Sequence, residues 1–184
     1  MCMDGRDGQL CFEWLNPLEI VWFEPDSAEG YEWFDKVRDN LTGRGHHVKS
    51  YSRIDDATIS RLRAIERVDR IVTELRWRPN EIGDLPGWVL SGKDGARQSD
   101  PGLYLLRRLG GGVNENTPKI VYTNTCEVDD VQKIRSSGAF YVTKPAHRVL
   151  LADFIINPTE AGIRRLSSVY RAMAILSYQC CDHF

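Results

Sequence analysis

The sequence lacks any apolar run approaching the ~20 residues that a membrane-spanning helix needs. It also lacks an N-terminal apolar segment behind basic residues, so we expect no secretory signal peptide. The formal net charge of −2 gives no electrostatic reason to expect binding to nucleic acid or to an anionic membrane surface. These absences favour a cytoplasmic protein that binds neither nucleic acid nor membrane.

Cysteines are also sparse, and their arrangement excludes two further classes. The chain has five of them, an odd number; Cys180 and Cys181 are adjacent, and no pair has Cys-x-x-Cys spacing. This pattern argues against a disulfide framework and against a zinc site. Cys126 has no evident histidine partner in the sequence pattern, so nucleophilic catalysis by a Cys/His pair is not favoured.

What the sequence does contain is an alternation of short apolar runs with amphipathic stretches. Periodicity predicts strands at residues 18–23, 46–51, 70–73, 119–123 and 140–143, and helices at residues 28–44, 57–66, 100–109, 128–137 and 148–156. Strands that alternate with helices in this way predict an α/β fold, with a five-stranded parallel sheet that is doubly wound by helices on both faces.

Two segments exceed what five strand–helix units require. Residues 76–99 read as a long inserted loop after the third strand, and residues 159–178 read as an extra C-terminal helix with an apolar stripe. We therefore divide the chain into an N-terminal extension at 1–17, a main domain at 18–156 and a C-terminal helical extension at 157–184.

The two segments suggest contacts with other proteins, each with an alternative. Long loops in compact domains are often functional, so we expect Trp77 and Trp88 to bind a protein partner; the alternative is that they pack over the sheet edge. The stripe of the C-terminal helix either packs on its own domain or forms a homodimer contact.

Polar residues follow the expected strands at their carboxyl ends, where open parallel sheets bind ligands. They are Glu24, Asp26, Glu74, Thr123, Asn124 and Lys144. Carboxylates of this kind can hold Mg²⁺, which prefers oxygen ligands. A lysine and a hydroxyl opposite them can hold the oxygens of a phosphoryl group. The set therefore indicates phosphoryl transfer to a carboxylate.

In order and type, these residues resemble the receiver domain of bacterial response regulators, which has a flavodoxin-like (CheY-like) fold. The resemblance covers about residues 18–156, and its most specific element is the Lys144-Pro145 pair within GAFYVTKP. It implies that Glu74 stands at the phosphate-accepting position, that Thr123 and Lys144 are phosphate-site residues, and that Tyr141 is the switch aromatic.

Two of these positions depart from the family pattern. The resemblance places an aspartate where this chain has Glu74, and Pro25 replaces one of the paired acids, leaving Glu24 and Asp26 as metal ligands with Glu74. The extra methylene of Glu74 moves its carboxylate by more than ~1 Å, and a displacement of that size can cost ~10²-fold in a positioned reaction. A Lys144–Glu74 ion pair would neutralise the buried acid.

We therefore expect a degenerate, or pseudo-, receiver: a stand-alone two-component signalling module that binds a protein partner and has no enzymatic activity. No cofactor is expected, apart from Mg²⁺ if the metal site survives. Two alternatives stay open. One is a functional receiver that accepts phosphate, and the other is a Toll/interleukin-receptor-like NAD-processing enzyme, although the first turn FEPDSAEG lacks a glycine-rich phosphate cradle.

Overall fold

The structure is a computed structural model, which describes residues 16–25, 31–85, 101–124 and 127–168. Several expectations fall outside these ranges: the N-terminal extension up to residue 15, the metal ligand Asp26, the inserted loop from residue 86 onward with the partner-binding Trp88, and the C-terminal extension beyond residue 168. Within the described part of the chain, no helix is both long and apolar enough to span a membrane.

The core is the expected five-stranded parallel sheet. Its strands are β1 (Glu19–Phe23), β2 (His47–Tyr51), β3 (Arg70–Thr73), β4 (Lys119–Thr123) and β5 (Phe140–Thr143), in the order β2-β1-β3-β4-β5. The strand order reverses beside β1, so the β1/β3 junction is where a doubly wound sheet opens its ligand crevice.

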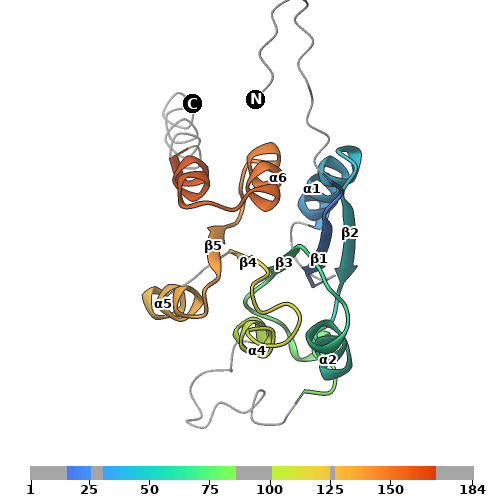
Figure 1. Cartoon of the computed structure of the whole chain (residues 1–184). Coiled ribbons are helices and arrows are strands. Elements are labelled where there is room, and N and C mark those ends of the chain that lie inside the picture. Colours follow the sequence, from blue (N-terminus) through green and yellow to red (C-terminus); the bar gives the residue numbers. More distant parts are fainter. Residues whose placement is uncertain (1–15, 26–30, 86–100, 125–126, 169–184) are drawn as a thin grey trace, which may run out of the picture.

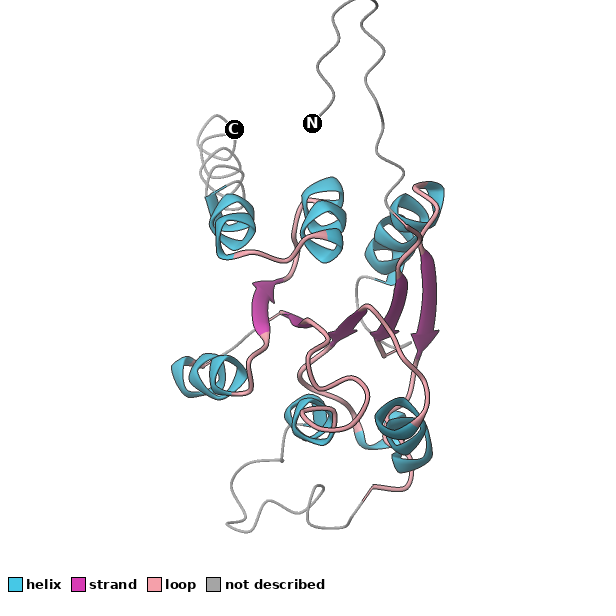
Figure 2. Ribbon diagram, viewed as in Figure 1, coloured by secondary structure: helices cyan, strands magenta, loops and turns pink. Residues whose placement is uncertain are grey.

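Helices cover both faces of the sheet (Figures 1 and 2). They are α1 (Tyr31–Gly43), α2 (Asp56–Ala64), α4 (Pro101–Arg108), α5 (Val128–Ser136) and α6 (Arg148–Ile156), with a short 3-10 turn, η1, at Pro79–Glu81. In Figure 1, α1 and α6 lie above the sheet, whereas α2, α4 and α5 lie below it. The doubly wound prediction is confirmed.

Side-chain alternation explains why two cores form. In β1, Ile20 and Trp22 pack into the core shared with α1 and α6, whereas Val21 and Phe23 pack against α2 and α4. All four side chains are buried. A strand covered on both faces must be apolar at every position, which is why the β1 sequence reads as a continuous apolar run.

A helical segment at residues 160–168 continues the chain after α6. Leu166 is buried in the α1/α6 core, and Ile163 packs against the same core. Gly162 permits this approach, because a Cβ atom there would lie 2.7 Å from the Phe154 ring. The described part of the extension therefore packs on its own domain.

The expectation that Trp77 presents an aromatic surface to a partner is wrong for this structure. Trp77 is only 5% exposed and packs in the core beneath α2 and α4. Its indole Nε1–H donates to the Glu74 carbonyl oxygen over 2.9 Å, which satisfies the one polar atom of the buried ring. The alternative, packing over the sheet edge, comes closer, since Trp77 packs inside the domain with residues of β1, α2 and α4.

Candidate functional site

Three charged residues converge at the carboxyl ends of the strands. Glu24 directly follows β1, Glu74 directly follows β3, and Lys144 directly follows β5. The first two strands are neighbours in the sheet, and Lys144 reaches them past the end of β4. All three side chains are 10% exposed or less. We call Glu24, Glu74 and Lys144 the charge cluster.

Lys144 bridges the two carboxylates of the cluster. Its Nζ lies 2.8 Å from Glu74 Oε2 and also forms a close ion pair with Glu24 Oε1. The predicted Lys144–Glu74 ion pair is therefore confirmed, and the second pair, with Glu24, was not foreseen. Buried charges persist in folded proteins when they are paired and hydrogen-bonded, and this lysine meets both carboxylates.

Glu74 is held by its backbone as well as by its side chain. Its N–H donates to the Phe23 carbonyl over 3.0 Å, and its own carbonyl accepts the Trp77 indole and Thr73 hydroxyl protons. On the side chain, Oε1 accepts the backbone N–H of Leu75 over 2.7 Å and, more weakly, that of Arg76 over 3.4 Å. The carboxylate is thus directed back onto its own chain.

Gly102 in α4 fixes the position of the Glu74 backbone. Its N–H donates to the Leu75 carbonyl over 3.1 Å. A Cβ atom at this position would lie 2.4 Å from the Glu74 carbonyl oxygen and 2.8 Å from Leu75 Cα. Any residue other than glycine would therefore push α4 away from the end of β3.

Glu24 is the more buried of the two acids. Its Oε2 accepts the Trp22 indole N–H over 3.3 Å, and its backbone N–H donates to the Tyr51 carbonyl. Burial raises the pKa of the Glu24 carboxyl above its ordinary value of 4.5; Lys144 opposes that rise, and the negative charge of Glu74 adds to it. Two carboxylates sharing one ammonium leave a net negative charge, which favours a proton on Glu24.

The Lys144 ammonium packs against the aromatic ring of Tyr122. The Nζ lies 5.1 Å from the centroid of the Tyr122 ring, a cation–π distance. The Tyr122 hydroxyl accepts the Ala146 N–H over 3.2 Å, and burial raises the pKa of Tyr122 to about 12. Lys144 is further positioned by its own N–H, which donates to the Thr123 carbonyl, and the Lys144–Pro145 peptide bond is cis.

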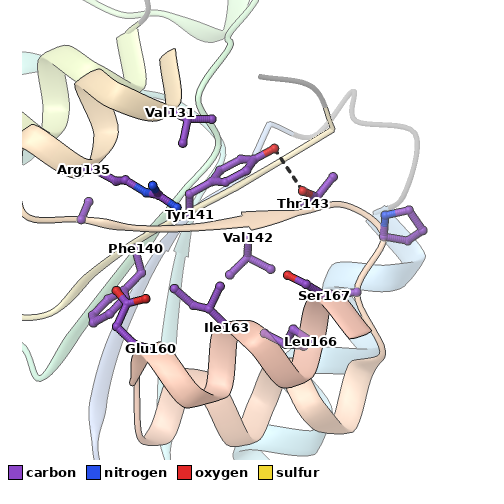
Figure 3. Close-up of a pocket in the computed structure, with 13 residues that line it drawn as sticks. Val131, Arg135, Phe140, Tyr141, Val142, Thr143, Glu160, Ile163, Leu166 and Ser167 are labelled. Carbon is purple, nitrogen blue, oxygen red and sulfur yellow. Dashed lines mark hydrogen bonds between the residues drawn. The ribbon is translucent and has the colours of Figure 1, made fainter. Parts of the chain in front are cut away.

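The two other predicted site residues lie differently. Thr123 ends β4 and is buried at 2% exposure, next to Lys144 through the backbone hydrogen bond just described. Tyr141 lies on the α5 side of β5, and its hydroxyl accepts the Thr143 Oγ1 proton over 3.0 Å (Figure 3). Both remain predicted phosphate-site and switch residues, but only Thr123 adjoins the charge cluster.

A pocket with a volume of about 350 Å³ lies around β5, and Figure 3 shows residues that line it. Val131, Arg135 and Tyr141 line its α5 side, whereas Val142 and the extension residue Ile163 line the other. The pocket lies along the sheet edge, because β5 pairs with β4 alone.

Sequence reasoning missed several residues that build the site. Trp22 and Tyr122 each lie next to the strand-end positions on the same sheet face as the cluster, so alternation along β1 and β4 could have identified them. Arg76 forms an ion pair with the buried Asp130 over 3.3 Å and so ties the chain after Glu74 to the start of α5. No sequence signal pairs residues so far apart.

The charge cluster does not fit Mg²⁺ in this arrangement. Mg²⁺ requires a near-octahedral set of oxygen ligands. All four carboxylate oxygens of Glu24 and Glu74 are already occupied, by Lys144, by the Trp22 indole and by the Leu75 amide. Among the described residues, no group of three His, Cys, Asp or Glu side chains is arranged to hold a metal.

Comparison with known proteins gives fold information only. No protein-family model matches the chain, and no curated protein matches it. Solved structures do. A CheY-like receiver domain protein from Methanospirillum hungatei is 14% identical with a TM-score of 0.54, and the match covers 80% of this chain and 98% of that one.

Two further structures agree. A response regulator receiver protein from Pseudomonas putida is 18% identical with a TM-score of 0.53, over 79% of this chain and 100% of that one. The non-phosphorylated HemR receiver domain from Leptospira biflexa is 18% identical with a TM-score of 0.51, over 77% and 95%. Together with the strand order, these matches establish that the chain has the fold of a response-regulator receiver domain.

Proposed function

We propose that the protein is a signalling module of the receiver type that acts by binding a protein partner, without a phosphorylation cycle and without enzymatic turnover. The observation that carries this proposal is the state of Glu74, the residue that the resemblance assigns to the phosphate-accepting position. Its carboxylate is ion-paired to Lys144 over 2.8 Å and accepts the Leu75 N–H over 2.7 Å.

The chemistry of phosphoryl transfer supports the absence of phosphorylation. A carboxylate that accepts a phosphoryl group needs an oxygen in line with the leaving group and cations that neutralise the developing charge. Both oxygens of Glu74 are occupied, and Lys144, the one cation that contacts it among the described residues, is shared with Glu24. A permanent negative charge at this position would keep the module in one signalling state.

Phosphate incorporation is the direct test. The chain is incubated with acetyl phosphate and Mg²⁺, and its intact mass is followed beside a receiver domain that is known to be phosphorylated. We expect no added phosphoryl group on this chain. Incorporation that disappears in Glu74→Ala would support the functional-receiver alternative and overturn the proposal.

Partner binding is tested separately. Crosslinking in an extract of the source cells, followed by mass spectrometry, compares the wild-type chain with Glu74→Gln, which keeps the size of the side chain and removes its charge. We expect one signalling protein that crosslinks to the wild type and is weakened in the variant. NAD consumption in the same preparations, followed by mass spectrometry, would instead support the NAD-processing alternative.

A further inference from the structure

We infer that the charge cluster excludes divalent cations, because the Lys144 ammonium lies between Glu24 and Glu74, where such a cation would have to bind. The inference rests on the proposed function, because it treats Glu74 as a fixed charge. It deepens that function by stating which cation pairs with that charge. The Lys144 ammonium would balance one of the two carboxylate charges from within the chain, independently of the Mg²⁺ concentration around it.

The first support is the bridging geometry. One ammonium contacts Glu24 Oε1 and Glu74 Oε2, which come from neighbouring strands β1 and β3. A divalent cation binds such a pair by the same oxygens. Since the ammonium and a metal ion cannot occupy the same space, a metal can bind there only if the Lys144 side chain moves away.

The second support is that Lys144 is held in place from several sides. Its backbone N–H is hydrogen-bonded to Thr123, its ammonium lies over the Tyr122 ring, and its side chain is 10% exposed. A lysine anchored by its strand, by a ring and by two carboxylates gains little from moving into solvent. A metal that entered beside it would bring a like charge next to the ammonium.

The remaining carboxylate oxygens give the third support. Glu24 Oε2 accepts the Trp22 indole proton, and Glu74 Oε1 accepts the Leu75 amide proton. These donors come from strand residues and from the backbone, so they cannot turn away without moving β1 or β3. Within the described residues, each carboxylate oxygen that does not contact Lys144 therefore already accepts a hydrogen bond.

Manganese binding tests the inference, because the concentration of free Mn²⁺ is measured directly by electron paramagnetic resonance. The wild-type chain, Lys144→Met, the double variant Lys144→Met/Glu24→Gln and the control Lys133→Met are titrated with Mn²⁺, and near-ultraviolet circular dichroism confirms folding. Lys133 is a half-exposed lysine on α5, so Lys133→Met removes one positive charge away from the charge cluster and serves as the matched control.

We expect no saturable site in the wild type or in Lys133→Met. Lys144→Met should gain one saturable site that binds Mn²⁺ at least about tenfold more tightly than the wild type does, and Mg²⁺ should displace the bound Mn²⁺. The double variant should lose this site again. Saturable Mn²⁺ binding to the wild type that Glu24→Gln removes would overturn the inference. The comparison of the wild type with Glu24→Gln needs no Lys144 variant, so it tests the inference even if Lys144→Met does not fold.

A folded Lys144→Met chain that gains no Mn²⁺ site would also overturn the inference. These results are separate from a failure of the proposed function. Phosphate on the wild-type Glu74 would remove the proposed function, whereas Mn²⁺ bound to an unphosphorylated wild type would remove only the claim about Lys144.

Discussion

Gly102 lies directly against the backbone of Glu74: a Cβ on Gly102 would be 2.4 Å from the Glu74 carbonyl oxygen. We predict that Gly102→Ala destabilises the fold by about 1–3 kcal/mol, because overpacking outweighs the gain of up to ~1 kcal/mol in helix propensity. Urea unfolding measures the change. Gly43→Ala is the control, since a Cβ there meets nothing within 4 Å. Equal effects of the two substitutions would contradict the predicted close contact.

Removing the cation from the cluster should be costly. Lys144→Met leaves Glu24 and Glu74 as neighbouring buried carboxylates, so we predict a loss of about 3–5 kcal/mol in the free energy of unfolding near neutral pH. The half-exposed Lys133→Met should change it by less than about 0.5 kcal/mol. Thermal and urea unfolding of both variants give the comparison, and a loss that is no larger for Lys144→Met would mean the ion pairs contribute little.

The raised pKa of Glu24 makes stability depend on pH in a defined direction. In the folded state Glu24 holds its proton more tightly than in the unfolded chain. Its contribution is therefore complete below pH 4.5 and is lost as the pH rises through the folded-state pKa. The free energy of unfolding of the wild type, minus that of Glu24→Gln, should fall between pH 4.5 and neutrality. A difference that stays constant or rises would show that burial does not dominate at Glu24.

Asn114 ties its own loop to the segment at residues 62–68, which is distant in sequence. Its side-chain amide donates to the Leu62 and Glu66 carbonyls and its oxygen accepts the Val68 N–H, in buried or partly buried surroundings. Asn114→Ala should cost about 3 kcal/mol, because it leaves these buried groups without a partner. The exposed Asn157→Ala should stay within about 0.5 kcal/mol of the wild type in the same denaturation experiment.

The C-terminal extension should contribute to the stability of the main domain. Leu166 is 7% exposed, so Leu166→Ala is expected to cost about 2–3 kcal/mol, whereas the exposed Ser167→Ala should cost almost nothing. Urea unfolding distinguishes them. If the two variants unfold at the same concentration, the packing of residues 160–168 on the α1/α6 core contributes little.

A homodimer contact through the extension stays a prediction. Light scattering of the full chain and of a chain that ends at residue 158 tests it, because loss of the contact would lower the subunit number. An unchanged subunit number in a folded truncated chain would contradict the dimer prediction.

Local sequence patterns predicted the sheet well for a physical reason. Residues 70–73, 119–123 and 140–143 are strands as expected, because each is a short apolar run covered by helices and bounded by polar residues. The same reasoning brought Glu24, Glu74 and Lys144 to one end of the sheet, since the carboxyl ends of parallel strands share one edge.

What local patterns could not predict depends on contacts between distant residues. Trp77 lies in a polar stretch and was expected at a surface, but its ring packs in the core with residues of β1, α2 and α4. The role of Gly102 depends on how closely α4 approaches β3. The bridging of Glu24 by Lys144 depends on sheet order, which puts β1 beside β3.

Because β5 is an edge strand of the sheet, the charge cluster should affect how readily that strand separates from β4. An outermost strand has one hydrogen-bonded neighbour, so it should be the first part of a sheet to fray. Here the strand is followed by Lys144, whose side chain passes β4 and is held by the acids that follow β1 and β3. Separating β5 from β4 would also separate buried ions, so the β5 amides that are bonded to β4 should exchange more slowly in the wild type than in Lys144→Met.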